Sequence, residues 1–413
     1  MSGVWTVTKV GNITDVVTKG TTPTSVGFKF VDSGINFIKV ESIGEDGLFR
    51  KNKIAHINKE CHEALRRSQL QVGDILFSIA GALGRVAIVS KDVLPANTNQ
   101  ALSIIRLKKE MGILPEFLVY TLKSNALAEQ IEKQRGGAAQ QNLSLSQVKN
   151  FEVSLPSVRE QKRIVAILDE AFAGIDAAIA NTEKNLANAR ELFESYLNSV
   201  FSQRGERWIE RSFSEVLTIT SKLVDPRELE HQNLLHVGAG NIISMKGDLV
   251  DLQTAAEEGL KSGKFIFDDT MVLYSKIRPY LMKVVRPEFS GLCSADIYPL
   301  SPKEEFICRD FLYYLLLSND FTDYAIAGSA RAGMPKVNRA HLFAYSVALP
   351  EVDEQRKLVE QLEAVTIETR RLESIYQQKL DSLMELKQSL LQQAFSGELT
   401  ANVTEQKNDE AVA

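Results

Sequence analysis

Two stretches of the chain carry apolar side chains at alternating steps of three and four residues. In residues 160–201 the stripe runs through Val165, Leu168, Phe172, Ile175, Ile179, Leu186, Ala189, Phe193, Tyr196 and Val200. In residues 354–395 it runs through Leu358, Leu362, Val365, Leu372, Tyr376, Leu383, Leu386 and Leu390, with the polar Thr369 and Lys379 as exceptions. This heptad spacing predicts two long helices. A single stripe more often marks a helix facing its own core. Two stripes at matching places favour a helix pair, parallel or antiparallel, about 60 Å long at roughly 1.5 Å per residue.

From Phe117 to Ser202 the chain matches itself at an offset of 194 residues without a gap, and further upstream it matches more loosely. Phe117, Leu118, Tyr120, Leu122, Ser124 and Asn125 fall on Phe311, Leu312, Tyr314, Leu316, Ser318 and Asn319, and the later matches include Leu155-Pro156 with Leu349-Pro350 and Glu160-Gln161 with Glu354-Gln355. The sequence therefore predicts a tandem duplication of a globular half followed by a long helix. The predicted parts are a first globular domain (1–156), a helix (157–204), a second globular domain (205–350), a second helix (351–400) and a disordered tail (401–413).

The globular halves read as a mixture of strands and helices. Short alternating runs at 36–40 and 74–79 lie beside glycine turns at 44–47 and 81–84, and residues 115–134 have the spacing of one helix. Pro156 and Pro350 are expected to end the strand before each long helix. The two copies differ most in their loops, which suits two related binding modules with different targets.

Composition narrows the function classes. A net charge of −5 and a pI near 5.8 argue weakly against a protein whose whole surface binds nucleic acid, although local basic faces remain compatible with them. Three cysteines without a CxxC and five scattered histidines do not predict a disulfide framework or a metal site. The first residues lack a signal pattern, and the longest apolar run is too short for a bilayer, so a cytoplasmic location is expected.

The repeated helix entries carry a family resemblance. LPSVREQKRIVAIL and LPEVDEQRKLVEQL, the GDILFS run and the terminal LLQQAFSGELT resemble the specificity (S) subunit of a type I restriction-modification system, over essentially residues 1–400. The resemblance implies an α+β fold with two target-recognition domains, and two helices, 158–202 and 352–396, that pair as an antiparallel coiled coil.

The resemblance also implies the function. Each domain would read one half of a split site on double-stranded DNA, while the helices set the gap and dock two methyltransferase subunits, joined by restriction-translocase subunits. The chain would have no catalysis and no cofactor of its own, because S-adenosylmethionine, ATP and Mg would be bound by the partners. The helix contacts would involve Leu168, Phe172, Ile175, Ile179, Leu186, Phe193, Leu362, Leu372, Leu383 and Leu390.

Basic and glycine-bearing loops are the candidates for DNA contact, although a single Lys or Arg is more often plain solvated surface. The first half offers Arg85 and the loop residues Arg135, Gln140, Gln141 and Asn142. The side-chain amides of the two glutamines and the asparagine could form paired hydrogen bonds with adenine edges. The second half offers Lys276, Arg278, Tyr280, Lys283, Arg331, Lys336 and Arg339.

The sequence is also compatible with two alternatives. One is an enzyme, a methyltransferase or nuclease with degenerate motifs, although the chain has no strand-borne GxGxxG and its GLKSGK at 259–264 departs from a P-loop. The other is an assembly scaffold without a DNA role. Modification or cleavage of DNA by the purified chain would favour the first, and failure of the assembled complex to select a sequence would favour the second.

Overall fold

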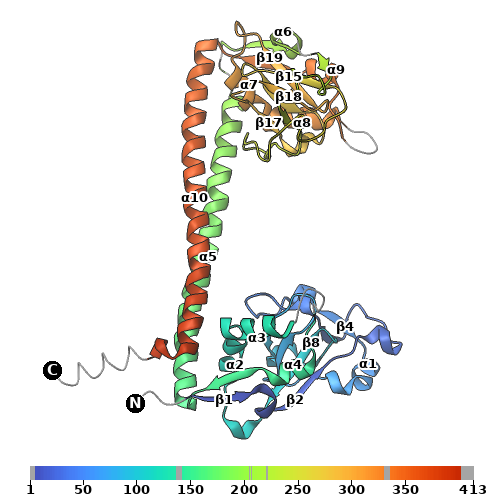
Figure 1. Ribbon diagram of the computed structural model, residues 1–413, viewed down its shortest axis with the longest axis vertical. Helices are drawn as coiled ribbons and strands as arrows, with labels where there is room; N and C mark the ends of the chain where they lie inside the picture. Colours follow the sequence, from blue (N-terminus) through green and yellow to red (C-terminus); the bar gives the residue numbers. More distant parts are fainter. Residues whose placement is uncertain are drawn as a thin grey trace, which may run out of the picture. The chain divides into compact units, whose positions relative to one another are not determined.

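Figure 1 shows the computed structural model of the chain, which describes residues 5–135, 142–203, 205, 207–219, 222–329 and 335–400. The contacts group the chain into two compact units. Unit 1 comprises Met1–Thr182 and Lys379–Ala413, and unit 2 comprises Glu183–Gln378. The predicted tail, 401–413, lies outside the described residues.

The two long helices are α5 (Val158–Ser202) and α10 (Val352–Ser396), and each contributes one part to each unit. In unit 2, Arg190 donates to Glu373 at 2.7 Å and Tyr196 donates to Gln361 at 3.0 Å. Rising numbers on α5 thus meet falling numbers on α10, so the helices are antiparallel there. In unit 1, the two helices pack in one apolar cluster that contains Leu168, Phe172, Ile175, Leu391 and Ala394.

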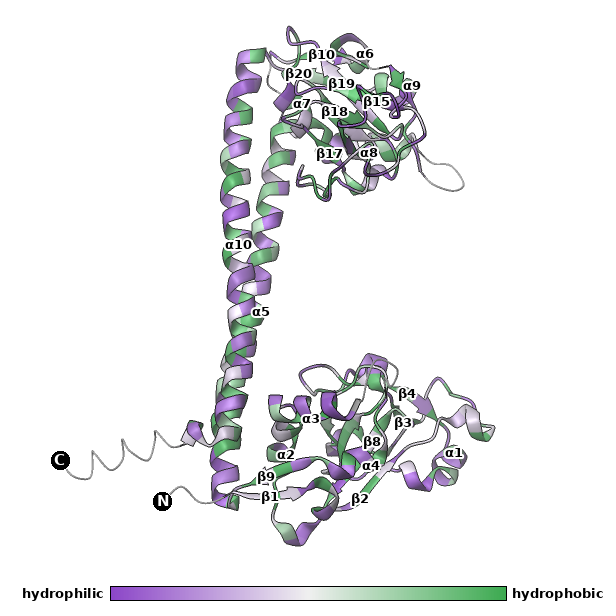
Figure 2. Ribbon diagram, in the orientation of Figure 1, coloured by the Kyte–Doolittle hydropathy of each residue, from purple (hydrophilic) through white to green (hydrophobic). Residues whose placement is uncertain are grey.

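The apolar stripes lie in the helix contact, with one shift of register. Figure 2 shows apolar and polar residues alternating along both helices. Of the ten predicted seam residues, Leu168, Phe172, Ile175 and Leu362 are buried, and Ile179, Leu186, Phe193, Leu372, Leu383 and Leu390 are half-buried. The polar Thr369 is also buried in the seam, at 8% exposure.

The seam prediction was wrong at two positions of α10. Lys379 is exposed and Leu380 takes its place at 7% exposure, while Leu386 is 47% exposed. A strict seven-residue repeat drifts around a straight α-helix, because 3.5 residues per turn falls short of roughly 3.6. A stripe extrapolated over many heptads therefore leaves the contact.

Three sheets are formed by the described residues in the globular half of unit 1. Strands β1 (Thr6–Lys9) and β9 (Glu152–Leu155) form an antiparallel pair. A four-stranded antiparallel sheet has the order β2-β8-β5-β6, and a three-stranded sheet has the order β4-β3-β7, in which β3 and β7 are parallel. Their bounds are β2 Thr14–Lys19, β3 Ile35–Ile38, β4 Ala55–Ile57, β5 Ile75–Ser78, β6 Val86–Ile88, β7 Ala96–Thr98 and β8 Leu102–Leu107, and the helices are α1 Lys59–Ala64, α2 Pro115–Leu122, α3 Asn125–Arg135 and α4 Leu145–Asn150.

The globular half of unit 2 repeats this plan. Strands β10 and β20 pair antiparallel, a four-stranded sheet has the order β11-β19-β16-β17, and a five-stranded sheet has the order β12-β15-β18-β13-β14 with β13 and β18 parallel. The bounds are β10 Ile209–Ser212, β11 Leu217–Thr218, β12 Leu223–Val224, β13 Leu235–Val237, β14 Gln253–Thr254, β15 Lys264–Phe267, β16 Val272–Ser275, β17 Val284–Val285, β18 Gly291–Cys293, β19 Ile297–Pro302 and β20 Ser346–Leu349, and the helices are α6 Phe213–Val216, α7 Arg309–Leu316, α8 Asn319–Ala327 and α9 Arg339–Phe343.

The repeat holds at the level of elements. The helices α2, α3, α4 and α5 begin 194 residues before α7, α8, α9 and α10, respectively. The strands β9 and β20 end at Leu155 and Leu349, directly before the prolines predicted to end them. The single helix predicted over 115–134 is two helices, since Ser124 interrupts it and its hydroxyl accepts from Leu127 N–H at 3.4 Å, as a capping serine does. Ser318 caps α8 in the same way.

Candidate nucleic-acid interface

Most of the candidate residues in the second half come from two segments that the structure joins. The backbone after β16 pairs with the segment before α9, because Val337 N–H donates to Lys276 C=O at 2.8 Å and Arg278 N–H donates to Pro335 C=O at 2.9 Å. This pairing brings the side chains of Lys276 and Lys336 to the same carboxylate, Asp296, at 4.0 and 3.1 Å. The structure therefore gathers predicted cations from two distant parts of the sequence.

Positive charge is crowded at this place, which we call the junction surface and define as Lys276, Arg278, Tyr280, Lys336 and Arg339. The pKa of Lys276 lies below its usual value, mainly because the amine is partly buried and next because Lys336 is close; Arg339 adds to this effect and Asp296 opposes it. One carboxylate, Asp296, thus pairs with two cations. A phosphate of DNA would supply the missing negative charge.

Tyr280 is held on an unusual turn beside these cations. The flanking residues Arg278 and Met282 have φ angles of 51° and 46°, a left-handed conformation that is uncommon outside glycine. Between them, Pro279–Leu281 forms a single 3-10 turn. Tyr280 is 53% exposed. A surface aromatic ring on a constrained turn next to positive charge suits stacking or groove contact with a nucleic acid.

Arg85 and Lys283 have a different place. Arg85 donates to the carbonyls of Val40 and Ile43 at 3.3 and 3.0 Å, and Lys283 donates to the carbonyl of Ala239. The two cations occupy equivalent positions, because Ser78 N–H donates to Arg85 C=O and Ser275 N–H donates to Lys283 C=O. In both halves the charged head ties a hairpin to the loop after a strand. These contacts favour a structural role for the pair over a contact with phosphate.

The first half has the same joint with other side chains. Leu143 N–H donates to Ile79 C=O at 2.8 Å, which is the counterpart of the bond between Val337 and Lys276. Asn142 is exposed beside this joint. A hollow of about 370 Å³ lies nearby and is lined by Val40, Glu41, Ala80, Gly81, Ala82, Arg85, Asn99 and Ala101. Gln140, Gln141 and Arg331 lie outside the described residues, as does the side chain of Arg135.

The two halves also differ in the side chains on one face of the sheet that contains β3 in unit 1 and β13 in unit 2, a difference that the sequence analysis did not predict. In unit 1 this face carries an apolar cluster of Phe37, Ile57, Cys61 and Leu65. Strand β13 pairs with β18 as β3 pairs with β7, and it has the buried His236 where β3 has Phe37. The repeat is loose in this region, so no signal in the sequence pointed to the exchange.

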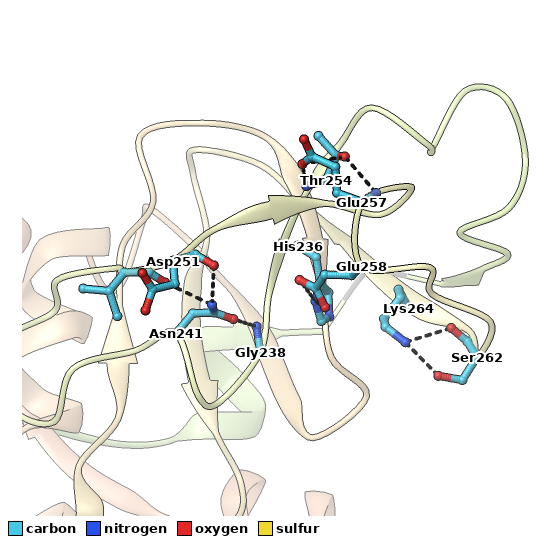
Figure 3. A network of polar contacts seen from close by, with 10 residues as sticks. His236, Gly238, Asn241, Asp251, Thr254, Glu257, Glu258, Ser262 and Lys264 are labelled. Carbon is cyan, nitrogen blue, oxygen red and sulfur yellow. Dashed lines mark hydrogen bonds and ion pairs between the residues drawn. The ribbon is translucent and has the colours of Figure 1, made fainter. Parts of the chain in front are cut away.

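Polar contacts replace the apolar cluster in unit 2. Figure 3 shows the His236 ring beside Glu258, whose carboxylate oxygens both lie 3.0 Å from Nδ1. The Nε2 atom is buried, and among the described residues it has no hydrogen-bond partner. On the same sheet the amine of Lys264 donates to the carbonyl and hydroxyl of Ser262 at 2.9 and 2.7 Å. This face therefore belongs to the part of the scaffold that differs between the repeats.

A further cluster contains Glu228, Glu230 and His231, whose ligand atoms lie within 4.8 Å of one another. His231 Nδ1 lies 3.5 Å from Glu228 and 3.0 Å from the Asp225 carbonyl, while Nε2 lies 3.5 Å from Glu230. The carboxylates face different ring nitrogens. A metal ion binds a histidine through one ring nitrogen, so this geometry does not favour a single metal ion shared by the three residues.

The described part of the chain holds no helix with both the length and the apolar character that a bilayer crossing requires.

Comparison with known proteins gives a consistent result. The sequence profile of the family described as "Type I restriction modification DNA specificity domain" matches residues 3–187 and again 205–381. The Type I restriction enzyme EcoDI specificity subunit of Escherichia coli is 30% identical over 322 residues, which cover 70% of this chain and 71% of that protein.

Two solved structures show the same fold. One, from work on complex assembly and conformational transition of a type I R-M system, has a TM-score of 0.78 at 19% identity and covers 96% of this chain and 98% of its own. The HsdS subunit from Thermoanaerobacter tengcongensis has a TM-score of 0.57 at 18% identity and covers 96% and 97%. Because the family profile matches both repeats and most of the chain, this protein belongs to the type I restriction-modification DNA specificity family.

Proposed function

We propose that the chain is the DNA-recognition subunit of a type I restriction-modification complex, in which each globular half reads one half of a split site. The proposal rests on the backbone pairing between the residue that follows β5 or β16 and the segment before α4 or α9. It recurs in both halves with the same backbone hydrogen bond, but Ile79 in one half corresponds to Lys276 in the other. A repeated frame with different surface side chains is what two readers of different half-sites require.

The two kinds of side chain at the joint have separate tasks. In the second half, Arg278, Lys336 and Arg339 contact phosphates and fix the position of the domain on the duplex. Lys276, whose amine donates to the Ala295 carbonyl, supports this surface from within the fold. The exposed Tyr280, and Asn142 in the first half, contact base edges or stack. The chain directs chemistry that other subunits carry out.

Removal of cations from the junction surface tests the proposal. Replacing Lys336 and Arg339 together with alanine should weaken DNA binding by the assembled complex and reduce the slope of log affinity against log salt by about 2 units. Lys261→Ala, which removes an exposed charge elsewhere in unit 2, is the matched control and should leave that slope unchanged. Unaltered affinity of the double variant at several salt concentrations would contradict this interface.

The partners follow from the same proposal. Two methyltransferase subunits, which bring S-adenosylmethionine, dock on the helices, and the restriction-translocase subunits bring ATP and Mg. Large apolar side chains on the helices that are exposed in the free chain support a docking role: Leu192, Ile367, Ile375, Met384 and Leu386 are 43–65% exposed. The purified chain alone is expected neither to methylate nor to cut DNA, and activity of the chain alone with S-adenosylmethionine or Mg would favour the enzyme alternative.

A further inference from the structure

Two buried glutamines occupy equivalent positions in the first turns of the long helices. Gln161 is 2% exposed and Gln355 is fully buried. The side-chain oxygen of Gln161 accepts from Leu114 N–H at 3.0 Å, and that of Gln355 accepts from Cys308 N–H at 3.0 Å. Leu114 and Cys308 are the N-cap residues of α2 and α7. Each glutamine therefore satisfies a backbone donor that the start of a domain helix leaves without an intrahelical partner.

The side-chain nitrogen of each glutamine donates to the carbonyl of the proline that precedes the long helix. Gln161 Nε2 donates to Pro156 C=O at 3.1 Å, and Gln355 Nε2 donates to Pro350 C=O at 2.9 Å and to Phe306 C=O at 2.7 Å. The orientation of the amide is fixed, because one end faces an N–H group and the other faces carbonyls. Glutamate lacks the donor and methionine lacks both functions. The contacts thus account for a glutamine at this place in both repeats.

A second contact holds the same domain helices. Phe117 of α2 packs against Phe395 of α10 with ring centroids 5.6 Å apart and an angle of 60°. Phe311 of α7 packs against Phe201 of α5 at 5.1 Å and 58°. Each globular half is therefore bound by the start of one long helix through a glutamine and by the end of the other through a phenylalanine. Of these two contacts, the glutamine constrains the orientation of the globular half more strongly, since hydrogen bonds restrict geometry more narrowly than ring packing does.

We propose that Gln161 and Gln355 are positioning residues that fix the orientation of each reading domain on its helix pair and thereby set the tolerance of the complex for the gap between half-sites. They touch no DNA in this role. The inference rests on the proposed function, because a gap exists only if the two halves read a split site.

Methylation of a DNA library by the complete complex tests the inference. The library holds both half-sites fixed and varies the gap one base pair at a time, and methylated adenines are identified by sequencing. Gln161→Met removes two hydrogen bonds and Gln355→Met removes three. For both variants we expect modification at the neighbouring gaps to rise about tenfold relative to the native gap. The preferred bases of both half-sites should stay the same.

The controls separate the possible failures. Gln378→Met makes the same change at an exposed position of α10 and should keep the wild-type gap preference. If the wild-type complex modifies no split motif, the proposed function itself is overturned. If the wild type selects one gap and both glutamine variants select it as sharply, the positioning role is overturned and the proposed function stands.

Hydrogen–deuterium exchange on the wild-type protein tests the inference even if the variants do not fold. In the native complex the backbone amides of Leu114 and Cys308 should exchange with solvent deuterium far more slowly than those of surface turns, because both are hydrogen-bonded to a buried side chain. Rapid exchange at both amides would overturn the inference without any variant.

Discussion

Arg286 joins the globular half of unit 2 to helix α10. Its guanidinium donates to Asp310 at 2.6 Å, contacts Glu363 of α10, and lies 4.7 Å from the ring of Tyr313. Burial alone would lower the pKa of Arg286, but hydrogen bonds to Glu363 and Asp310 outweigh burial and raise that pKa above its usual value. No sequence pattern singles out this residue, because its partners are 24 and 77 positions away.

Replacing Arg286 with methionine should destabilise unit 2 by about 2 kcal/mol, since two partly buried carboxylates lose their shared donor. Arg356→Met is the control, because Arg356 forms an exposed pair with Asp353 within one helix and should change stability by less than about 0.5 kcal/mol. Denaturant unfolding at neutral pH measures both. Equal effects of the two substitutions would contradict the role assigned to Arg286.

The ionised carboxylate of Glu373 should stabilise the folded protein at neutral pH but not at low pH. Burial raises the pKa of Glu373, but hydrogen bonds from Arg190 and Lys246 outweigh burial and hold the pKa below its usual value. A lowered carboxyl pKa contributes stability that is present above the unfolded pKa, about 4.3, and is lost as pH falls through the folded value.

The Glu373→Gln variant should therefore be less stable than the wild type by about 1 kcal/mol at pH 7. That difference should shrink as the pH falls below about 4, where the wild-type carboxyl becomes protonated. Unfolding curves for both proteins at matched pH values give the difference directly. A difference that stays constant down to pH 3 would mean that the charge of Glu373 contributes nothing.

At the scale of elements, the heptad pattern predicted both long helices but not the whole contact. The heptad stretches 160–201 and 354–395 lie within α5 and α10, and the bounds that the family resemblance implied, 158–202 and 352–396, agree with the two helices. Periodicity alone could not reveal the exchange of Lys379 for Leu380, because the side chain that faces the partner depends on small departures from seven-residue spacing. Likewise, the break between α2 and α3 depends on the capping bond of Ser124, which apolar spacing does not report.

A pair of leucines on α10 tests the observed seam. Leu362 is fully buried and Leu386 is 47% exposed, although the heptad prediction gave both the same place. Leu362→Ala should cost about 2–5 kcal/mol, and Leu386→Ala less than about 1 kcal/mol. Thermal unfolding of the two variants, compared with the wild type, measures the contrast. Similar losses at both positions would restore the strict heptad register.

At the scale of the whole molecule, the sequence predicted the duplication, the fold class and the family, because each rests on a pattern repeated over many residues. The candidate interface was harder to predict. Lys276 and Lys336 are 60 positions apart and are brought together by backbone pairing, whereas Arg85 and Lys283 donate to backbone carbonyls of the same chain. A charged residue in a sequence does not show whether its donors are already bound inside the fold.

Inserting one heptad into each long helix, after Thr182 and before Lys379, should lengthen the gap of the methylated motif by about 3 base pairs, at roughly 1.5 Å per helical residue and 3.4 Å per base pair. The half-site bases should not change. Sequencing methylated DNA from cells that express the variant with its partners reports both properties. A motif with the old gap and altered bases would contradict the spacer role.

The apolar cluster that joins α2, α5 and the end of α10 can form only late in translation. Phe117, Ile164 and Leu168 share one apolar cluster with Leu391 and Ala394, although more than half of the chain separates the two groups. A ribosome releases the first group long before it makes the second. The apolar face of α5 in the first unit therefore stays uncovered while about half of the chain is translated. A nonsense codon near position 390 should damage the first globular half rather than the nearer second one.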